Sequence, residues 1–266
     1  MVIGQEKICR KIQMSTLDTF PRTLMLVGER GDGKHMLCSY ACTYLGLPSE
    51  DITDELTLEK IEEITQRVEP YMYIIRVNDI SVKEENTILK FLEEPTKNSF
   101  IMLLADTENG ILQTILNRCT IWHLQHYTKE VLMTFTTHGA DLRILDIART
   151  PGMVLKMNSH PFGEMLDLAN KIIDKIGGAT LPNTLSLTNK MAFKNEKDKY
   201  DIDLFVEILL SAMSVKCRTV TDAKIYSAYE LTSRLSKAIH TPNVDKKALF
   251  DSYLVKLREN MRGSIV

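Results

Sequence analysis

Two patterns of hydrophobic and polar positions divide the chain near residue 125. Before that point, short apolar, aromatic or β-branched runs alternate with segments whose apolar residues recur at helical spacing. Such runs are typical of strands buried in a parallel sheet. Because strands and helices alternate, residues 1–125 are predicted to form a doubly wound α/β domain. The predicted strands are 24–27, 71–77, 100–105 and 119–124.

After residue 125 the pattern predicts helices alone. A small helical unit is expected over residues 128–160, followed by a helix and a polar connection that contains Gly177 and Gly178. Three long amphipathic helices are then predicted, at about 201–216, 221–239 and 244–261. We therefore expect three domains, with boundaries at 1–125, 126–177 and 178–266.

The segment from Val27 to His35, VGERGDGKH, has the form G-x-x-x-x-G-K. It lies between a predicted strand and a predicted helix, which is the context of a phosphate-binding loop. Backbone N–H groups of such a loop, the positive end of the helix and a Lys ammonium together hold phosphates. The sequence thus predicts a nucleotide site at the carboxyl ends of the strands. Its candidate phosphate-binding residues are Gly28, Gly31, Gly33 and Lys34.

One part of this site is replaced. His35 stands where a Ser or Thr hydroxyl ordinarily holds Mg²⁺. Mg²⁺ prefers oxygen ligands in octahedral geometry, and an imidazole suits it poorly. We therefore expect the scaffold of a nucleotide site without a bound metal ion.

Composition adds limits to this prediction. The chain has 266 residues, of which 44% are hydrophobic and 26% charged, as is typical of a soluble globular protein. Its formal net charge of −2 excludes a strongly basic nucleic-acid-binding chain. Neither a long apolar run nor a signal-peptide pattern occurs, so we expect a cytoplasmic protein without membrane contact. The five cysteines include no C-x-x-C pair, which favours buried reduced thiols over zinc ligands.

Several separated segments carry a specific resemblance. Residues 86–95 read NTILKFLEEP and residues 103–119 read LLADTENGILQTILNRC. They resemble the L-L-K-x-L-E-E-P and P-T-I-x-S-R-C motifs of bacterial clamp-loader subunits of the AAA+ class. The opening Ile3 and Gly4 are similar to the segment that contacts adenine in that family, and residues 238–257 are similar to its terminal helix pair.

The resemblance implies an AAA+ P-loop domain, a helical lid over 126–177 and a helical collar for oligomerisation over 178–266. Among these subunits the chain resembles the delta-prime type of DNA polymerase III, whose members do not hydrolyse ATP. In the ATPase members, the second strand ends in an Asp that holds Mg²⁺ and a Glu that orients water. Here Arg76 and Val77 take those places, and Met153 takes the place of the lid arginine. The expected hydroxyl near residues 105–106 is also missing, so we predict no ATP hydrolysis by this chain.

Asn117-Arg118-Cys119 matches the family's Ser-Arg-Cys motif, whose arginine reaches the γ-phosphate of a neighbouring subunit's ATP. The resemblance thus implies that Arg118 is an arginine finger that acts in trans. The alternative interpretation is a surface arginine before a strand.

Two positions leave alternatives open. Lys34 either holds a phosphate or pairs with a carboxylate such as Asp32 or Asp79. Arg76 is hypothesised to occupy the space of the metal, where it would neutralise phosphate or Asp79. We expect no required cofactor, and any binding of ATP, ADP, phosphate or sulfate to be weak and independent of Mg²⁺. The acidic residues at 51–55 are interpreted as the N-cap of a helix.

The function implied by the resemblance is that of a clamp-loader subunit in DNA replication, and not of an enzyme. Its expected partners are gamma/tau-like ATPase subunits and a delta-like subunit, with the sliding clamp and primer–template DNA reached through the complex. One alternative is a divergent AAA+ ATPase with an altered metal site. Another is a regulatory protein related to clamp loaders.

Overall fold

The computed structural model describes residues 2–93, 96, 98–193, 199–239 and 244–262. The chain forms two compact units. The P-loop unit contains residues 1–135 and 149–153, and the helical unit contains residues 136–148 and 154–266. The end of the LEEP motif at 94–95 and the segment 240–243 lie outside the described residues.

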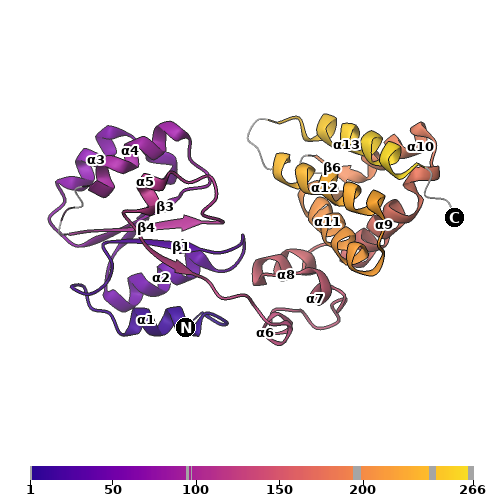
Figure 1. The fold of residues 1–266 in the computed structure, drawn as a ribbon. Coiled ribbons are helices and arrows are strands. Elements are labelled where there is room, and N and C mark those ends of the chain that lie inside the picture. Colours follow the sequence, from indigo (N-terminus) through magenta and orange to yellow (C-terminus); the bar gives the residue numbers. More distant parts are fainter. Residues whose placement is uncertain (1, 94–95, 97, 194–198, 240–243, 263–266) are drawn as a thin grey trace. The chain divides into compact units, whose positions relative to one another are not determined.

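The P-loop unit is built on a parallel sheet of five strands in the order β2-β3-β4-β1-β5 (Figure 1). Helices cover both faces of this sheet, with α1 and α2 on one side and α3 and α4 on the other (Figure 1). The strands are β1 (Thr23–Val27), β2 (Ser49–Asp51), β3 (Tyr71–Arg76), β4 (Ser99–Ala105) and β5 (Thr120–His123). The helices are α1 (Glu6–Gln13), α2 (Lys34–Leu45), α3 (Leu58–Thr65), α4 (Val82–Glu93), α5 (Gln113–Leu116) and α6 (Lys129–Met133), with a 3₁₀ turn η1 (Thr53–Glu55).

Alternation along the central strands divides the core into two layers. Leu24 and Leu26 of β1 face α1 and α2, whereas Met25 and Val27 face the opposite layer with α3, α4 and α5. Because both faces are covered, all seven residues of β4 are buried. This confirms the interpretation of continuous apolar runs as strands buried on both sides.

Three strands were not predicted: β2 in the P-loop unit, and the short strands β6 (Met191–Ala192) and β7 (Tyr200–Asp201), which pair with each other in the region where helices alone were expected. β2 has the sequence Ser-Glu-Asp and lies at the edge of the sheet, where it pairs with β3. Its side chains are exposed or half-buried, so it lacks the apolar pattern on which the other predictions depended. The strand forms because the edge of β3 offers free backbone groups, which pairing satisfies regardless of side-chain polarity.

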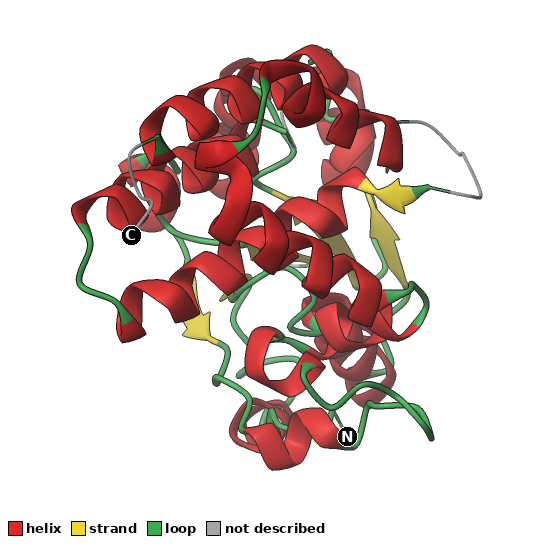
Figure 2. Cartoon of the chain, turned by 90° about the vertical axis from the view of Figure 1, so that its right-hand side faces the viewer, coloured by secondary structure: helices red, strands yellow, loops and turns green. Residues whose placement is uncertain are grey.

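Helices make up most of the helical unit. Figure 2 shows the helices of the chain in red and its strands in yellow. Helix α11 packs against α9 and α12, and α12 packs against α13. The rings of Phe205, Phe250 and Tyr253 meet in the core, where the Tyr253 and Thr232 hydroxyls are hydrogen-bonded at 2.7 Å. The elements are α7 (Ile144–Ile147), α8 (Pro151–Asn158), α9 (Phe162–Lys175), η2 (Ile176–Gly178), α10 (Leu181–Leu185), η3 (Ser186–Lys190), β6 (Met191–Ala192), β7 (Tyr200–Asp201), α11 (Ile202–Thr219), α12 (Ala223–Ala238) and α13 (Lys246–Met261).

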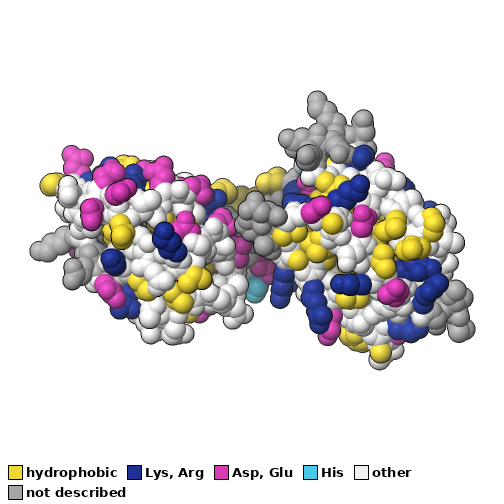
Figure 3. All heavy atoms as spheres, turned by 90° about the horizontal axis from the view of Figure 1, so that it is seen from above, with side chains coloured by type: hydrophobic (Ala, Val, Ile, Leu, Met, Phe, Trp, Pro, Cys, Tyr) yellow, Lys and Arg dark blue, Asp and Glu magenta, His cyan; other side chains and the backbone are white. Residues whose placement is uncertain are grey.

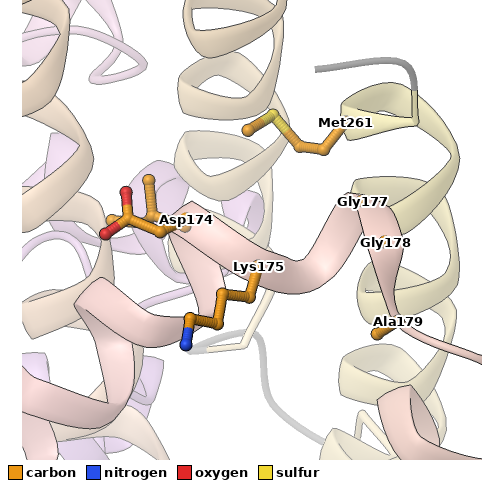
Figure 4. A pocket seen from close by; sticks show the side chains of 7 residues that line it. Asp174, Lys175, Gly177, Gly178, Ala179 and Met261 are labelled. Carbon is orange, nitrogen blue, oxygen red and sulfur yellow. The ribbon is translucent and has the colours of Figure 1, made fainter. Parts of the chain in front are cut away.

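A cavity of about 450 Å³ lies in the helical unit where the end of α9 meets the end of α13 (Figure 4). Gly177 is in such close contact here that a Cβ would overlap the carbonyl oxygen of Met261. The carboxylate of Asp174, which lines the cavity, is paired with Lys216 at 2.6 Å. The glycines of this connection therefore allow close packing of two helix ends.

The division between the two units does not fall at residue 125, the position of the predicted domain boundary. Residues 126–135 and 149–153 belong to the P-loop unit because they contact the phosphate loop and the N-terminal segment directly. The start of α8 thus belongs to one unit and its remainder to the other. The division into a P-loop domain, a lid and a collar stays a prediction.

Candidate functional site

The phosphate loop forms where it was predicted, between β1 and α2. Gly31 and Gly33 have φ angles of 88° and 87°, a conformation that glycine adopts without strain. Gly33 is the N-cap of α2, and the Gly28 N–H donates to the carbonyl of Ala105 at 3.0 Å. The loop is therefore fixed beside the carboxyl end of β4.

Lys34 is bound within its own chain. Its ammonium donates to the Asp106 carboxylate at 2.7 Å, to the Glu29 carbonyl at 3.1 Å and to the Gly28 carbonyl. An ammonium has three N–H donors, and three acceptors surround this one. The carboxylate partner is Asp106, and not the predicted Asp32 or Asp79.

Asp106 follows β4 directly, and its backbone N–H donates to the Asn78 side chain at 2.6 Å. The pairing of β1 with β4 sets Val27 opposite Ala105, so the residues that follow the two strands are neighbours. This adjacency is the signal that could have identified Asp106 as the partner of Lys34.

Asp32 occupies a different place in the loop. Its side chain is buried, and burial raises its pKa to about 6. A hydrogen bond from the Glu29 backbone opposes the rise in this pKa, as does the positive charge of Lys34. The loop therefore contains a carboxyl group whose charged form is destabilised by burial.

A cavity of about 350 Å³ opens beside the loop. Cationic and acidic side chains share its wall, which includes Lys34, His35, Arg76, Asp79 and Asp106. Three of the four predicted phosphate-loop residues and two of the altered positions therefore line one cavity, and Gly28 does not. Val77 is buried in the core and does not line the cavity.

Arg76 lies at the end of β3 and forms ion pairs with Asp51 at 3.4 Å, Asp54 at 3.3 Å and Asp79 at 3.4 Å. The pair with Asp79 is one of the two alternatives proposed from the sequence. Thr53 fixes the strand end, because its hydroxyl accepts from the Arg76 backbone N–H at 2.9 Å. A guanidinium paired with three carboxylates thus lies at the end of β3. Its correspondence to the metal-ligand position of ATPase relatives stays a prediction.

The interpretation of residues 51–55 as a helix N-cap is wrong. The N-cap of α3 is Thr57, whose hydroxyl accepts from the Lys60 N–H. Asp51 and Asp54 instead pair with Arg76, because the unpredicted strand β2 brings this segment beside β3. Among the described residues, no group of three or more His, Cys, Asp or Glu side chains could hold a metal ion.

The N-terminal segment is tied to residues 125–127. The buried amide of Gln5 exchanges two hydrogen bonds of 2.8 Å with the backbone of Gln125. Gly4, with a φ angle of 79°, lies under the ring of Tyr127, whose hydroxyl donates to the Asp32 carbonyl at 2.7 Å. Ile3 is exposed. Sequence reasoning identified Ile3 and Gly4 but missed Tyr127, which connects them to the phosphate loop.

The predicted lid position Met153 lies in a turn that contacts the loop. The hydroxyl of Thr150 donates to the Arg30 carbonyl at 3.1 Å and accepts from the Met153 N–H. The Gly152 N–H donates to the Gly31 carbonyl at 3.1 Å. Thr150 and Gly152 therefore contact the phosphate loop directly, through a side-chain hydroxyl and a backbone N–H.

Arg118 is not among the residues that line the phosphate-loop cavity. It follows α5 and donates to the Glu93 carboxylate at 2.7 Å and to the Thr114 carbonyl at 2.8 Å. About a third of its side chain (34%) is exposed. The cation predicted to act on a neighbour is thus accessible to solvent.

The parallel sheet has the order β2-β3-β4-β1-β5, with a phosphate loop between β1 and α2 and helices after the sheet, which is the α/β P-loop arrangement that was predicted. Among P-loop proteins the chain is similar to subunits of DNA polymerase III. Residues 47–128 match the family model described as DNA polymerase III, delta subunit. The matched segment contains two of the four segments on which the resemblance was based, residues 86–95 and 103–119.

A curated relative supports the same assignment. DNA polymerase III subunit delta' of Haemophilus influenzae is 33% identical over 60 residues, which cover 23% of this chain and 18% of that protein. These matches confirm the predicted resemblance to clamp-loader subunits of the delta-prime type.

Solved structures match over most of the chain. A DNA polymerase III gamma subunit-related protein of Thermotoga maritima has a TM-score of 0.49 at 14% identity, covering 97% of this chain and 100% of that one. The RuvB Holliday junction branch migration motor of Thermotoga maritima has a TM-score of 0.48 at 15% identity, covering 97% of this chain and 84% of that one.

Charged and hydrophobic side chains are interspersed on the face shown in Figure 3. None of the helices in the described part of the chain combines the length and apolar character that a membrane crossing requires.

Proposed function

We propose that this protein is a non-hydrolysing, delta-prime-like clamp-loader subunit that supplies Arg118 to the ATP of a neighbouring subunit. The observation that carries the proposal is the contrast between the two cations. Lys34 is enclosed by three acceptors of its own chain, whereas Arg118 is partly exposed and has more donors than its two acceptors within the described residues can use.

Hydrolysis requires a lysine on the phosphates, a metal ion and an oriented water. Lys34 already neutralises Asp106, so a bound phosphate would have to displace a carboxylate held at 2.7 Å. Arg76 brings a positive charge to the strand end where a metal ligand is needed, and Val77 offers no base. No required cofactor is proposed, and anion binding at the loop is proposed to be weak and independent of Mg²⁺.

An arginine finger acts by presenting a planar, permanently charged group to the charge that develops on the γ-phosphate. It must reach outward from its own subunit. Arg118 fits this requirement because it follows a short helix, is partly exposed and has five N–H donors for two acceptors among the described residues.

The proposed partners are gamma/tau-like ATPase subunits and a delta-like subunit, arranged so that Arg118 faces a nucleotide of the neighbour. The sliding clamp and primer–template DNA would be reached through this complex. The helical unit supplies the long helices α11, α12 and α13 for assembly.

The test is ATPase activity reconstituted from the cognate loader subunits, clamp and primed DNA. Arg118→Ala is expected to lower turnover by about 10²-fold or more, as for other arginine fingers. The matched control is Arg10→Ala, which removes an exposed arginine of α1 and should leave the rate unchanged.

Gel filtration must show that both variants assemble. An unchanged rate with Arg118→Ala in an intact complex would contradict the trans role. Turnover by the isolated chain, lost on Lys34→Ala, would instead favour a divergent ATPase.

A further inference from the structure

Glu93 and Arg118 form an ion pair to which the proposed function assigns no role. The Glu93 Oε1 atom accepts from Arg118 Nη2 at 2.7 Å, and the Thr114 carbonyl accepts from Nη1 at 2.8 Å. The side chains are 52% and 34% exposed, respectively. Two acceptors of the same chain therefore hold a surface arginine in one orientation.

Both partners are attached to the same part of the core. Glu93 ends α4 directly after Phe91 and Leu92, which are buried. The Arg118 N–H donates to the carbonyl of Ile115, a fully buried residue of the same hydrophobic cluster. The backbone positions of the pair are thus fixed, and only the side chains remain to be ordered.

The contacts leave the guanidinium able to bind a further anion. It has five N–H donors in a planar fork, and among the described residues Glu93 and Thr114 take one each. One N–H on each terminal nitrogen and the Nε–H remain available. Because the pair is half-exposed, solvent screens the Glu93 charge, so the main effect of the contact is on orientation.

We propose that Glu93 is a positioning residue that preorganises Arg118 for the neighbour's γ-phosphate. This inference rests on the proposed trans role of Arg118. A long side chain that is already ordered loses less conformational freedom when it docks. This lowers the free-energy cost of placing the guanidinium against the γ-phosphate during hydrolysis.

The experiment uses the reconstituted, clamp- and DNA-stimulated ATPase with Glu93→Ala, Glu93→Gln, Arg118→Ala and the double variant Glu93→Ala/Arg118→Ala. Glu93→Ala should lower kcat by about two- to tenfold, the range expected for one side chain that must be immobilised, with KM for ATP unchanged. Glu93→Gln keeps an acceptor oxygen and should recover most of the rate. In the Arg118→Ala background, Glu93→Ala should have no further effect.

Glu62→Ala, which removes an exposed carboxylate from α3, is the matched control and should not change kcat. Thermal unfolding and gel filtration verify that each variant folds and assembles. If Arg118→Ala abolishes stimulation while Glu93→Ala leaves kcat unchanged or raises it, the positioning role is wrong and the finger stands. If Arg118→Ala itself has no effect, both proposals fail.

Discussion

Two cation–carboxylate pairs of equal length behave differently in this protein. Lys34 meets Asp106 at 2.7 Å, and Arg118 meets Glu93 at 2.7 Å. The Lys34 side chain is 10% exposed and the Arg118 side chain 34%. The first pair lies in the wall of a cavity that resembles a nucleotide site, whereas the second is a surface contact.

The chemistry of the two cations explains the contrast. An ammonium with three donors is satisfied by the three acceptors around Lys34, so nothing remains for a ligand. A guanidinium has five donors, and two contacts leave it able to bind a further group. In the proposed function, the salt bridge of Lys34 therefore opposes anion binding at the loop, whereas the salt bridge of Arg118 orients that side chain.

Among substitutions around the phosphate loop, where Lys34 is enclosed, Gly152→Ala should have the largest effect on stability. A Cβ there would lie 2.7 Å from the Cα of Gly31, and neither backbone segment can move without breaking the contact between them. We expect the P-loop unit to lose about 2–3 kcal/mol of stability, as for other overpacked sites. The single tryptophan, Trp122 in β5, reports urea unfolding of this unit by fluorescence.

Gly46→Ala is the control for Gly152→Ala, because Gly46 has a φ angle of 66° but nothing within 4 Å of an added Cβ. Its cost should be about 1 kcal/mol, from backbone strain alone. Equal losses for the two variants would show that residues 150–152 do not close the loop tightly.

Asp32→Asn should stabilise the P-loop unit, with an effect that depends on pH. Because the folded pKa of about 6 exceeds the unfolded value, the folded state binds more protons between about pH 4 and 6. Wild-type stability therefore falls as pH rises through this window. The gain on substitution should be about 1–2 kcal/mol above pH 7 and should disappear below about pH 4.

The same Trp122 fluorescence assay, repeated from pH 4 to 8, measures the gain for Asp32→Asn. Asp18→Asn, which changes an exposed carboxylate of the same unit, should show no such dependence. A gain that does not vary with pH would contradict the assignment to buried charge.

Asp106→Asn should have the smallest effect on stability, about 1 kcal/mol or less, because Asp106 is 42% exposed. It should, however, release Lys34 and make binding of ATP or inorganic phosphate stronger than in the wild type, without a requirement for Mg²⁺. Isothermal titration calorimetry with and without Mg²⁺ measures this change.

Asp79→Asn provides the matched comparison for Asp106→Asn, since Asp79 lines the same cavity but pairs with Arg76. It should strengthen anion binding less than Asp106→Asn does. The reverse order would identify Arg76, and not Lys34, as the cation that an anion reaches.

Much of the fold could be predicted from local patterns. The four apolar runs are strands, and the G-x-x-x-x-G-K segment forms its loop because glycine spacing and the preceding strand are both local signals. β2 was missed because an edge strand is stabilised by backbone pairing and needs no apolar residues. The ion pairs of Arg76 with Asp51 and Asp54 could not be predicted without it, whereas the pair with Asp79 was one of the alternatives proposed from the sequence.

The cation partners were the least predictable part of the candidate site. Asp106 and Lys34 are 72 residues apart in sequence, and only the register of β1 against β4 brings them together. Tyr127 gave no signal, because its role depends on the close approach of Gly4. Predicting such contacts requires strand order, which the hydrophobic pattern alone does not supply.

The pair between Lys34 and Asp106 also bears on how reversible the loss of a nucleotide site would be. Restoring a hydroxyl in place of His35 would improve nothing while Lys34 remains neutralised, and removing Asp106 first would expose a cation with no metal site to use it. Neither single change would therefore restore a metal-dependent site: the first leaves Lys34 paired, and the second strengthens anion binding without supplying a metal ligand. A requirement for two simultaneous changes would act as an evolutionary barrier, and would tend to preserve the non-hydrolysing role proposed for this chain.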